Sequence, residues 1–152
     1  MAKRFEVTGL RELGQAFRAL DAEVQLKVAG NAASAGARVF KKRIAQLAPV
    51  ADAPYLVEGV VVDPGNIGRN VIVKRLKASE TPVTAEALVV VRGKRKDGYA
   101  SRIGSLQEFG TVNQPPQPFF RPGAEQSMEP AAQAVKKKLQ QGIEKKIKEL
   151  SK

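Results

Sequence analysis

The sequence predicts an α+β fold in which an antiparallel β-sheet of about three to five strands is packed by a long N-terminal helix and a C-terminal helix. Apolar residues recur at helical spacing near both ends of the chain, and short valine-rich runs lie between them. The connections are rich in glycine and proline. The length of 152 residues predicts a single domain, 1–152, with a core of aliphatic side chains and a few Phe.

The N-terminal part of the chain is predicted to be an arm followed by a long helical segment. Residues 1–9 alternate briefly between apolar and polar side chains, which is typical of a short edge strand or of an extended arm. From residue 10 the apolar positions step by three or four, so residues 10–47 are expected to be helical. One straight helix of that length would exceed a compact domain of this size, and Gly30 is the expected place of a break. Pro49 ends the segment.

The middle of the chain is predicted to be a long loop followed by a β-meander. The loop, residues 50–69, contains three glycines and two prolines and includes one strand candidate at 57–62. The meander, residues 70–110, has an Asp97-Gly98 pair that is typical of a hairpin turn. Its expected strands are 70–76, 86–92 and, on a weaker pattern, 103–109.

A proline-rich arm and a second helix are predicted to complete the chain. The arm, residues 111–122, contains four prolines and should be extended and stiff. In residues 123–150 apolar side chains again recur at helical spacing, and lysines occupy the other faces. Pro130 is either the first residue of this helix or a kink in a helix that begins near Pro122.

The composition argues against most enzyme chemistry. The chain has no Cys and no His, which removes thiol nucleophiles, cysteine-based zinc sites and histidine acid–base catalysis. It contains no glycine-rich phosphate-binding motif, and only Glu108 and Asp63 are carboxylates in unusual contexts. Two isolated carboxylates make neither a catalytic pair nor a metal site, so both are expected to be structural. We therefore expect a protein that is not an enzyme and that uses no cofactor or metal.

The net charge of +11 is concentrated in two segments. Residues 133–152 contribute +5, either as a solvated helix face or as a contact with phosphate or a partner. Residues 92–102 contribute +4, either as a solvated loop or as a contact with an anionic neighbour, DNA or an acidic protein face, that would offset the repulsion between cations beside a turn. The candidates for this contact are Arg92, Lys94, Arg95 and Lys96. No base-reading motif and no membrane-spanning apolar run is present, so membranes are not expected among the partners.

A second candidate site surrounds the proline-rich arm. Phe119 and Phe120 are adjacent, and neighbouring side chains of an extended chain face opposite sides. Either both pack where the helix meets the sheet, or one inserts into a neighbouring subunit as an interface anchor. The candidate residues for binding a partner or another subunit are Phe109, Gly110, Thr111, Phe119, Phe120, Arg121 and Pro122.

These residues also carry a family resemblance. Glu108-Phe109-Gly110-Thr111, followed by Pro118-Phe119-Phe120-Arg121-Pro122, resembles the E-F-G-T…P-F-x-R-P signature of a tailed-phage family. These are the tail-completion, or neck, proteins similar to the lambda Z protein and its HK-type phage relatives. Further phrases at residues 5–10, 48–49 and 64–71 resemble the family in the same order along the chain.

The resemblance implies a structural virion protein of a long-tailed bacteriophage, present in the host cytoplasm during assembly and then in the tail or neck. It would form a ring of copies of itself, expected to be a hexamer, that completes the tail and joins it to the head. Its partners would be the tail terminator or tail tube protein and the head connector or adaptor, and the genome would pass through its channel. The composition leaves an alternative open, namely a small basic protein that binds nucleic acid without sequence preference.

Overall fold

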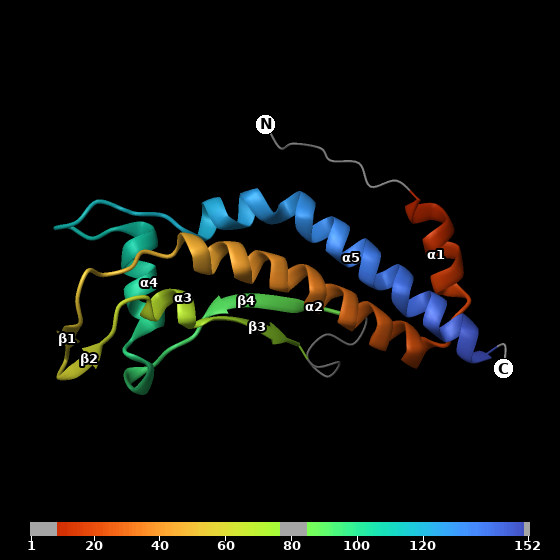
Figure 1. Ribbon diagram of the computed structural model, residues 1–152, viewed down its shortest axis with the longest axis horizontal. Helices are drawn as coiled ribbons and strands as arrows, with labels where there is room; N and C mark the ends of the chain where they lie inside the picture. Colours follow the sequence, from red (N-terminus) through yellow and green to blue (C-terminus); the bar gives the residue numbers. More distant parts are fainter. Residues whose placement is uncertain (1–8, 77–84, 151–152) are drawn as a thin grey trace. The chain divides into compact units, whose positions relative to one another are not determined.

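The computed structural model describes residues 9–76 and 85–150 of the chain, and it confirms the α+β class (Figure 1). Apart from Gly9, the predicted N-terminal arm or strand lies outside these residues. The elements, in chain order, are α1 (Leu10–Arg18), α2 (Ala22–Leu47), β1 (Tyr55–Val57), β2 (Val60–Val62), α3 (Asn66–Arg69), β3 (Val71–Arg75), β4 (Ala87–Val91), the 3₁₀ turn η1 (Arg95–Asp97), α4 (Ala100–Phe109) and α5 (Phe120–Leu150).

Two compact units share these elements. Of the described residues, the terminal unit contains 9–39, 75–76, 85–88 and 128–150. The central unit consists of Phe40–Lys74 and Val89–Ser127. The long helices α2 and α5 each contribute one part to the terminal unit and one part to the central unit.

The N-terminal helical segment breaks before Gly30 rather than at it. Helix α1 ends at Arg18, and α2 begins at Ala22 and continues through Gly30 to Leu47. At the break, the side-chain amide of Gln25 donates a hydrogen bond to the carbonyl oxygen of Leu20 at 2.6 Å, which satisfies a carbonyl that the turn leaves open. A Cβ atom at position 30 would collide with the guanidinium of Arg75, so this glycine gives room to a side chain and leaves the helix unbroken.

The core of the terminal unit lies between α1, the N-terminal part of α2 and the C-terminal part of α5. Leu20, Val28 and Ile143 are buried, and side chains such as Phe17 and Leu139 pack against them. Glycines bring the two long helices close together, since a Cβ atom at Gly36 would lie 2.6 Å from Cγ2 of Val135. The apolar positions that predicted helices therefore also predict this core.

The four strands form two separate two-stranded antiparallel sheets instead of one larger sheet. Strands β3 and β4 confirm the strands expected at 70–76 and 86–92. The single strand expected at 57–62 is instead the hairpin of β1 and β2, in which Val57 pairs with Val60. Its two turn residues, Glu58 and Gly59, have φ angles of 48° and 78°, the left-handed geometry that suits a two-residue hairpin turn.

The predicted strand at 103–109 and the predicted hairpin turn at Asp97-Gly98 are both wrong. Residues Ala100–Phe109 form helix α4, so the 70–110 segment is a pair of strands followed by a helix rather than a meander. Gly98 and Tyr99 are left-handed, with φ angles of 60° and 52°, and they lead from η1 into α4. Gly104 of this helix is buried, and a Cβ atom there would lie 3.6 Å from side-chain carbons of Ile67 and Phe119. Tertiary packing of the helix thus decides a segment whose local pattern is weak.

The C-terminal helix begins earlier than predicted, at Phe120 rather than residue 123. Pro122 therefore lies in its first turn, where the missing N–H group has no helical partner to lose. Pro130 lies inside the helix, which decides between the two arrangements that the sequence left open. Of the predicted arm, residues 111–119 are outside helices and strands apart from one bridge between Thr111 and Gln114.

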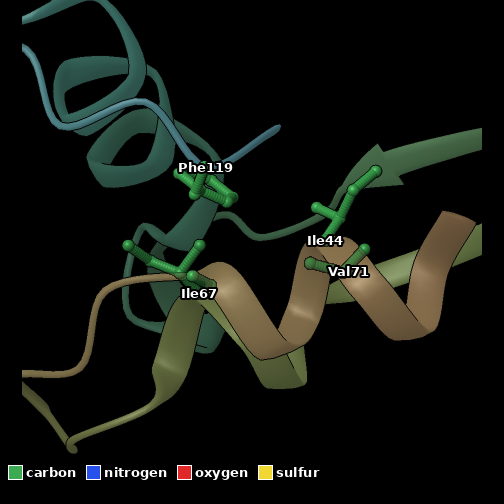
Figure 2. Packing of buried hydrophobic residues seen from close by; sticks show 5 residues of the cluster. Ile44, Ile67, Val71 and Phe119 are labelled. Carbon is green, nitrogen blue, oxygen red and sulfur yellow. The ribbon is translucent and has the colours of Figure 1, made fainter. Parts of the chain in front are cut away.

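The core of the central unit brings together α2, α3, β3 and the residue that precedes α5. Ile44, Ile67, Val71 and Phe119 are all buried and lie in one cluster (Figure 2). Helix α5 approaches α2 closely at Gly123, where a Cβ atom would lie 2.8 Å from Cγ1 of Ile44. This core fixes the starting point of α5, and with it the geometry of the candidate site.

Candidate functional site

The carboxylate of Glu108 joins the end of α4 to the start of α5. Its Oε2 atom accepts hydrogen bonds from the backbone N–H groups of Phe119 and Phe120, each at 2.8 Å. Its Oε1 atom accepts a third from the N–H group of Arg121, at 3.1 Å. The first amides of a helix have no partner within the helix, and the positive end of the helix dipole favours an anion there. Glu108 therefore caps α5, which is a structural role.

The same contact lowers the pKa of Glu108. Partial burial acts in the opposite direction, but the amides of Phe120, Phe119 and Arg121 stabilise the ionised carboxylate, and the charge of Arg121 adds to their effect. The capping group is consequently a carboxylate at neutral pH.

The chain between the two ends of this contact forms an exposed loop, residues 109–118, which we call the 109–118 loop (Figure 1). Its base is held by a hydrogen bond from the N–H group of Gln117 to the carbonyl oxygen of Gln107, at 2.7 Å. Its tip turns at a bridge in which the N–H group of Thr111 donates to the carbonyl oxygen of Gln114. Gly110 is required at the bend, since its φ angle is 74° and a Cβ atom would lie 2.8 Å from the nitrogen of Pro116. The loop is thus fixed at both its base and its tip.

The two adjacent phenylalanines both pack within the central unit. Phe119 is 2% exposed and belongs to the core. Phe120 is half-buried against that core and meets Phe119 edge to face, with ring centroids 6.3 Å apart. The sequence left open whether both rings pack inside the chain or one of them inserts into a neighbouring subunit. Phe119 packs inside the chain and is therefore not available as an anchor for a partner.

Other apolar side chains around the loop are exposed. Phe109 is 71% exposed and Val112, at the tip, is fully exposed. Thr111 and Arg121 are also exposed, whereas Gly110 and Pro122 are half-buried. Phe109 is among the residues predicted from the sequence, whereas Val112 is not. The signal that could have found it is a lone valine among Thr, Asn, Gln and Pro in a turn.

An apolar groove of about 570 Å³ lies next to the capping contact. Strand β4 and helix α4 form two of its walls, and the start of α5 forms the third. Ser101, Gly104 and Ser105 give α4 small side chains on the side that faces the groove. The sequence did not predict the groove because the wall formed by α4 was expected to be a strand. The lining residues are Val89, Val90, Val91, Ser101, Gly104, Ser105, Glu108, Phe109, Phe119, Phe120, Arg121 and Ala124.

The four predicted cationic residues lie around η1 and are all exposed. Within the described part of the chain, none of Arg92, Lys94, Arg95 and Lys96 forms an ion pair. Beside them, Glu58 in the β1–β2 turn accepts a hydrogen bond from Arg102 at 2.6 Å. The pKa of Glu58 is lowered mainly by a hydrogen bond from the Tyr99 hydroxyl and, to a smaller extent, by the hydrogen bond from Arg102. The bond between Tyr99 and Glu58 also raises the pKa of Tyr99. The β1–β2 hairpin therefore contacts the 92–102 segment through Arg102, and it forms no ion pair with Arg92, Lys94, Arg95 or Lys96.

Two other kinds of feature are absent from residues 9–76 and 85–150. These residues contain no group of three or more acidic side chains placed to hold a metal ion. None of their helices is both long enough and apolar enough to cross a membrane.

The central unit thus combines a helix start capped by a carboxylate, a fixed exposed loop with apolar side chains, and an apolar groove beside them. Comparison with known proteins adds no assignment, since no family model, no curated protein and no solved structure matches the chain.

Proposed function

We propose that this protein is a structural virion subunit of a long-tailed bacteriophage that forms a ring at the head-proximal end of the tail. The ring completes the tail, joins it to the head, and lets the genome pass through its channel. The observation that carries the proposal is the contact of Glu108 with the amides of Phe119, Phe120 and Arg121. This contact links the two phrases of the E-F-G-T…P-F-x-R-P signature, because Glu108 in the E-F-G-T phrase caps the helix that begins in the P-F-x-R-P phrase.

The capping contact suits an assembly protein because it fixes the loop before any partner binds. A loop that is already ordered loses little conformational entropy on association, so more of the interaction energy appears as affinity. Apolar side chains at its exposed positions, Phe109 and Val112, supply buried area once a partner covers them. The proposed partners are other copies of this chain, the tail terminator or tail tube protein, and the head connector or adaptor.

The exposed cations around η1 fit a channel that DNA passes through. Arg92, Lys94, Arg95 and Lys96 supply positive charge without a base-reading element, which matches sequence-independent contact with phosphates. An acidic face of a neighbouring ring would be recognised by the same charges.

The test is to delete the gene from a phage or prophage that carries it and to image the particles by negative-stain electron microscopy. We expect DNA-filled heads and tails that remain separate, together with recovery of joined virions when the purified protein is added back. Joined, infectious virions formed without the protein would contradict the proposal. An add-back of Glu125→Ala, a change at an exposed residue of α5, serves as the control for handling of the protein.

The second candidate function is sequence-independent binding of nucleic acid. It is favoured by the unpaired cations around η1 and by exposed lysines on α5 such as Lys137, Lys138 and Lys145. This function predicts duplex binding by the purified protein whose log affinity falls with log salt by about 0.9 for each phosphate contacted. Alanine at the four η1 cations should then make that slope shallower. Weak or absent binding at physiological salt would rule it out in favour of the virion proposal.

A further inference from the structure

We propose that Glu58, in the turn of the β1–β2 hairpin, is an internal competitor for the anion that the cations around η1 bind. Its carboxylate occupies Arg102, and a phosphate of a nucleic acid backbone must displace it to reach that guanidinium. We call this contact the Glu58 latch. The inference rests on the proposed contact of the η1 cations with phosphates, and it names how that same site is restrained.

The hairpin turn by itself does not require a glutamate at position 58. Among residues 9–76 and 85–150, Glu58 and Tyr99 are the only non-glycine residues with a positive φ angle, at 48° and 52°. A two-residue turn of this kind favours Asn, Asp or Gly, and other side chains there strain the backbone. The two strained residues contact each other, since the Tyr99 hydroxyl donates a hydrogen bond to Glu58. The side-chain contact thus gives the glutamate a role that the turn does not.

The latch places a negative charge among the cations of the 92–102 segment. Nη1 of Arg102 lies 2.6 Å from Oε1 of Glu58. The pKa of Glu58 is lowered first by the hydrogen bonds from Tyr99 and Arg102, and then by the charges of Arg102 and Arg95. Glu58 is therefore ionised at neutral pH and offsets part of the +4 charge of this segment. A carboxylate and a phosphate oxygen use the same guanidinium donors, so the two compete for Arg102.

The latch can open without unfolding the hairpin. Both side chains of the ion pair are largely exposed, 63% for Arg102 and 56% for Glu58, and pairs of exposed groups are weakened by solvent and salt. Strands β1 and β2 pair only with each other among the described strands, so movement of the turn breaks no larger sheet. Val62, at the base of the hairpin, is buried and keeps the hairpin attached when the turn is released.

The charges exposed by release suit a nucleic acid backbone. Arg92, Lys94, Arg95 and Lys96 are exposed and form no ion pair within the described part of the chain, and Arg102 would add a fifth cation. A duplex carries one phosphate charge for about every 1.7 Å of its axis, which supplies an anion for each of several closely spaced cations. No base-reading element is needed for such a contact. We therefore assign the external anion to nucleic acid phosphates.

Binding of a 20-base-pair DNA duplex to the full chain, measured by fluorescence anisotropy at pH 7, tests the latch. We expect Glu58→Gln to tighten binding by about two- to fivefold, because Arg102 becomes free for a phosphate. Glu125→Gln is the matched control, since it makes the same chemical change at an exposed residue of α5. It should change the affinity by less than about 1.5-fold. Equal effects of the two substitutions, or weaker binding by Glu58→Gln, would overturn the proposal.

A double-mutant cycle separates competition at Arg102 from a general effect of charge. In an Arg102→Ala background Glu58 has lost the group for which it competes. The gain from Glu58→Gln should then fall to the level of the Glu125→Gln control. A gain that persists without Arg102 would show that Glu58 acts through its charge alone, and the latch would be wrong.

The outcomes also separate the latch from the functions proposed above. Duplex binding that does not respond to Glu58→Gln would leave nucleic acid contact standing and remove the latch. No duplex binding by wild type or by Glu58→Gln would remove both. Binding of poly-glutamate that equals duplex binding at the same charge concentration would assign the site to an acidic protein face and overturn the choice of nucleic acid. Joined virions formed without the protein would remove the neck function but leave the latch intact.

Discussion

Removing the carboxylate of Glu108 tests the central feature of the candidate site, the cap on α5. Glu108→Ala leaves the amides of Phe119, Phe120 and Arg121 without their acceptor. Loss of a helix cap costs about 0.5–2 kcal/mol, and loss of an anion at the helix N-terminus costs a further ~0.3–1 kcal/mol. We therefore expect Glu108→Ala to lower the free energy of unfolding by about 2 kcal/mol, measured by urea denaturation at pH 7.

Glu108→Gln separates the hydrogen bonds from the charge. The glutamine carbonyl can still accept from the amides of Phe119 and Phe120, but its NH₂ group would face the N–H group of Arg121, donor against donor. About 1 kcal/mol is the expected cost, roughly half that of alanine. Glu125→Ala, also on α5 but exposed, should change stability by less than about 0.5 kcal/mol.

The pH dependence gives the sign of the charge effect. The pKa of Glu108 is lower in the folded chain than in the unfolded one, so the unfolded state binds more protons in the acid range. The stabilisation is complete above the ordinary carboxyl pKa and is lost as the pH falls through the lowered value. The difference between wild type and Glu108→Gln should therefore shrink on acidification. A cost below about 0.5 kcal/mol for Glu108→Ala, or a difference that stays constant with pH, would refute the cap.

Three further predictions concern other parts of the chain. Phe119→Ala should cost about 3–5 kcal/mol because it empties a buried site, whereas Phe109→Ala should stay within about 0.5 kcal/mol in the same urea assay. Gly123→Ala should destabilise the protein by about 1–3 kcal/mol, since the new Cβ atom would lie 3.0 Å from the backbone of Ile44. Gly14→Ala is the control, because a Cβ atom there would lie no closer than 3.9 Å to a neighbouring side chain, and it should stabilise the protein by up to about 1 kcal/mol. Equal effects of the two substitutions would contradict the close approach of α5 to α2. In a Tyr55→Phe background, absorbance titration should give Tyr99 a pKa above the usual tyrosine value that falls on Glu58→Gln, and an unchanged midpoint would rule out the hydrogen bond.

The α+β class and the two long helical segments could be predicted because their apolar residues repeat at helical spacing over many turns. The strands at 70–76 and 86–92 were predictable from their valine runs. The segment at 103–109 was not, because its Ile, Leu and Phe do not repeat often enough to separate a strand from a helix. In the folded chain this segment packs against α3, which is distant in sequence, and a local pattern does not contain that contact.

The candidate site divides in the same way. The sequence singled out the phrases that contain Glu108 and Phe119, and it predicted that the segment between them is neither helix nor strand. The groove was not predictable, because its walls come from β4, α4 and α5, and one of those elements was expected to be a strand. The sequence also did not decide whether Phe119 or Phe120 enters the core, because the two side chains are equally apolar. Their orientations depend on where α5 begins.

By itself, the sequence determined the fold class, the concentration of positive charge in two segments, and the absence of Cys and His chemistry. These follow from composition and from periodicity, which act locally along the chain. The tertiary structure alone decided that Glu108 caps α5, that Phe119 is buried while Val112 is exposed, and that a groove lies beside them. The physical reason is that these features depend on elements distant in sequence. A carboxylate can accept hydrogen bonds from the free amides of a helix, and a side chain can become buried, only after those elements have packed together.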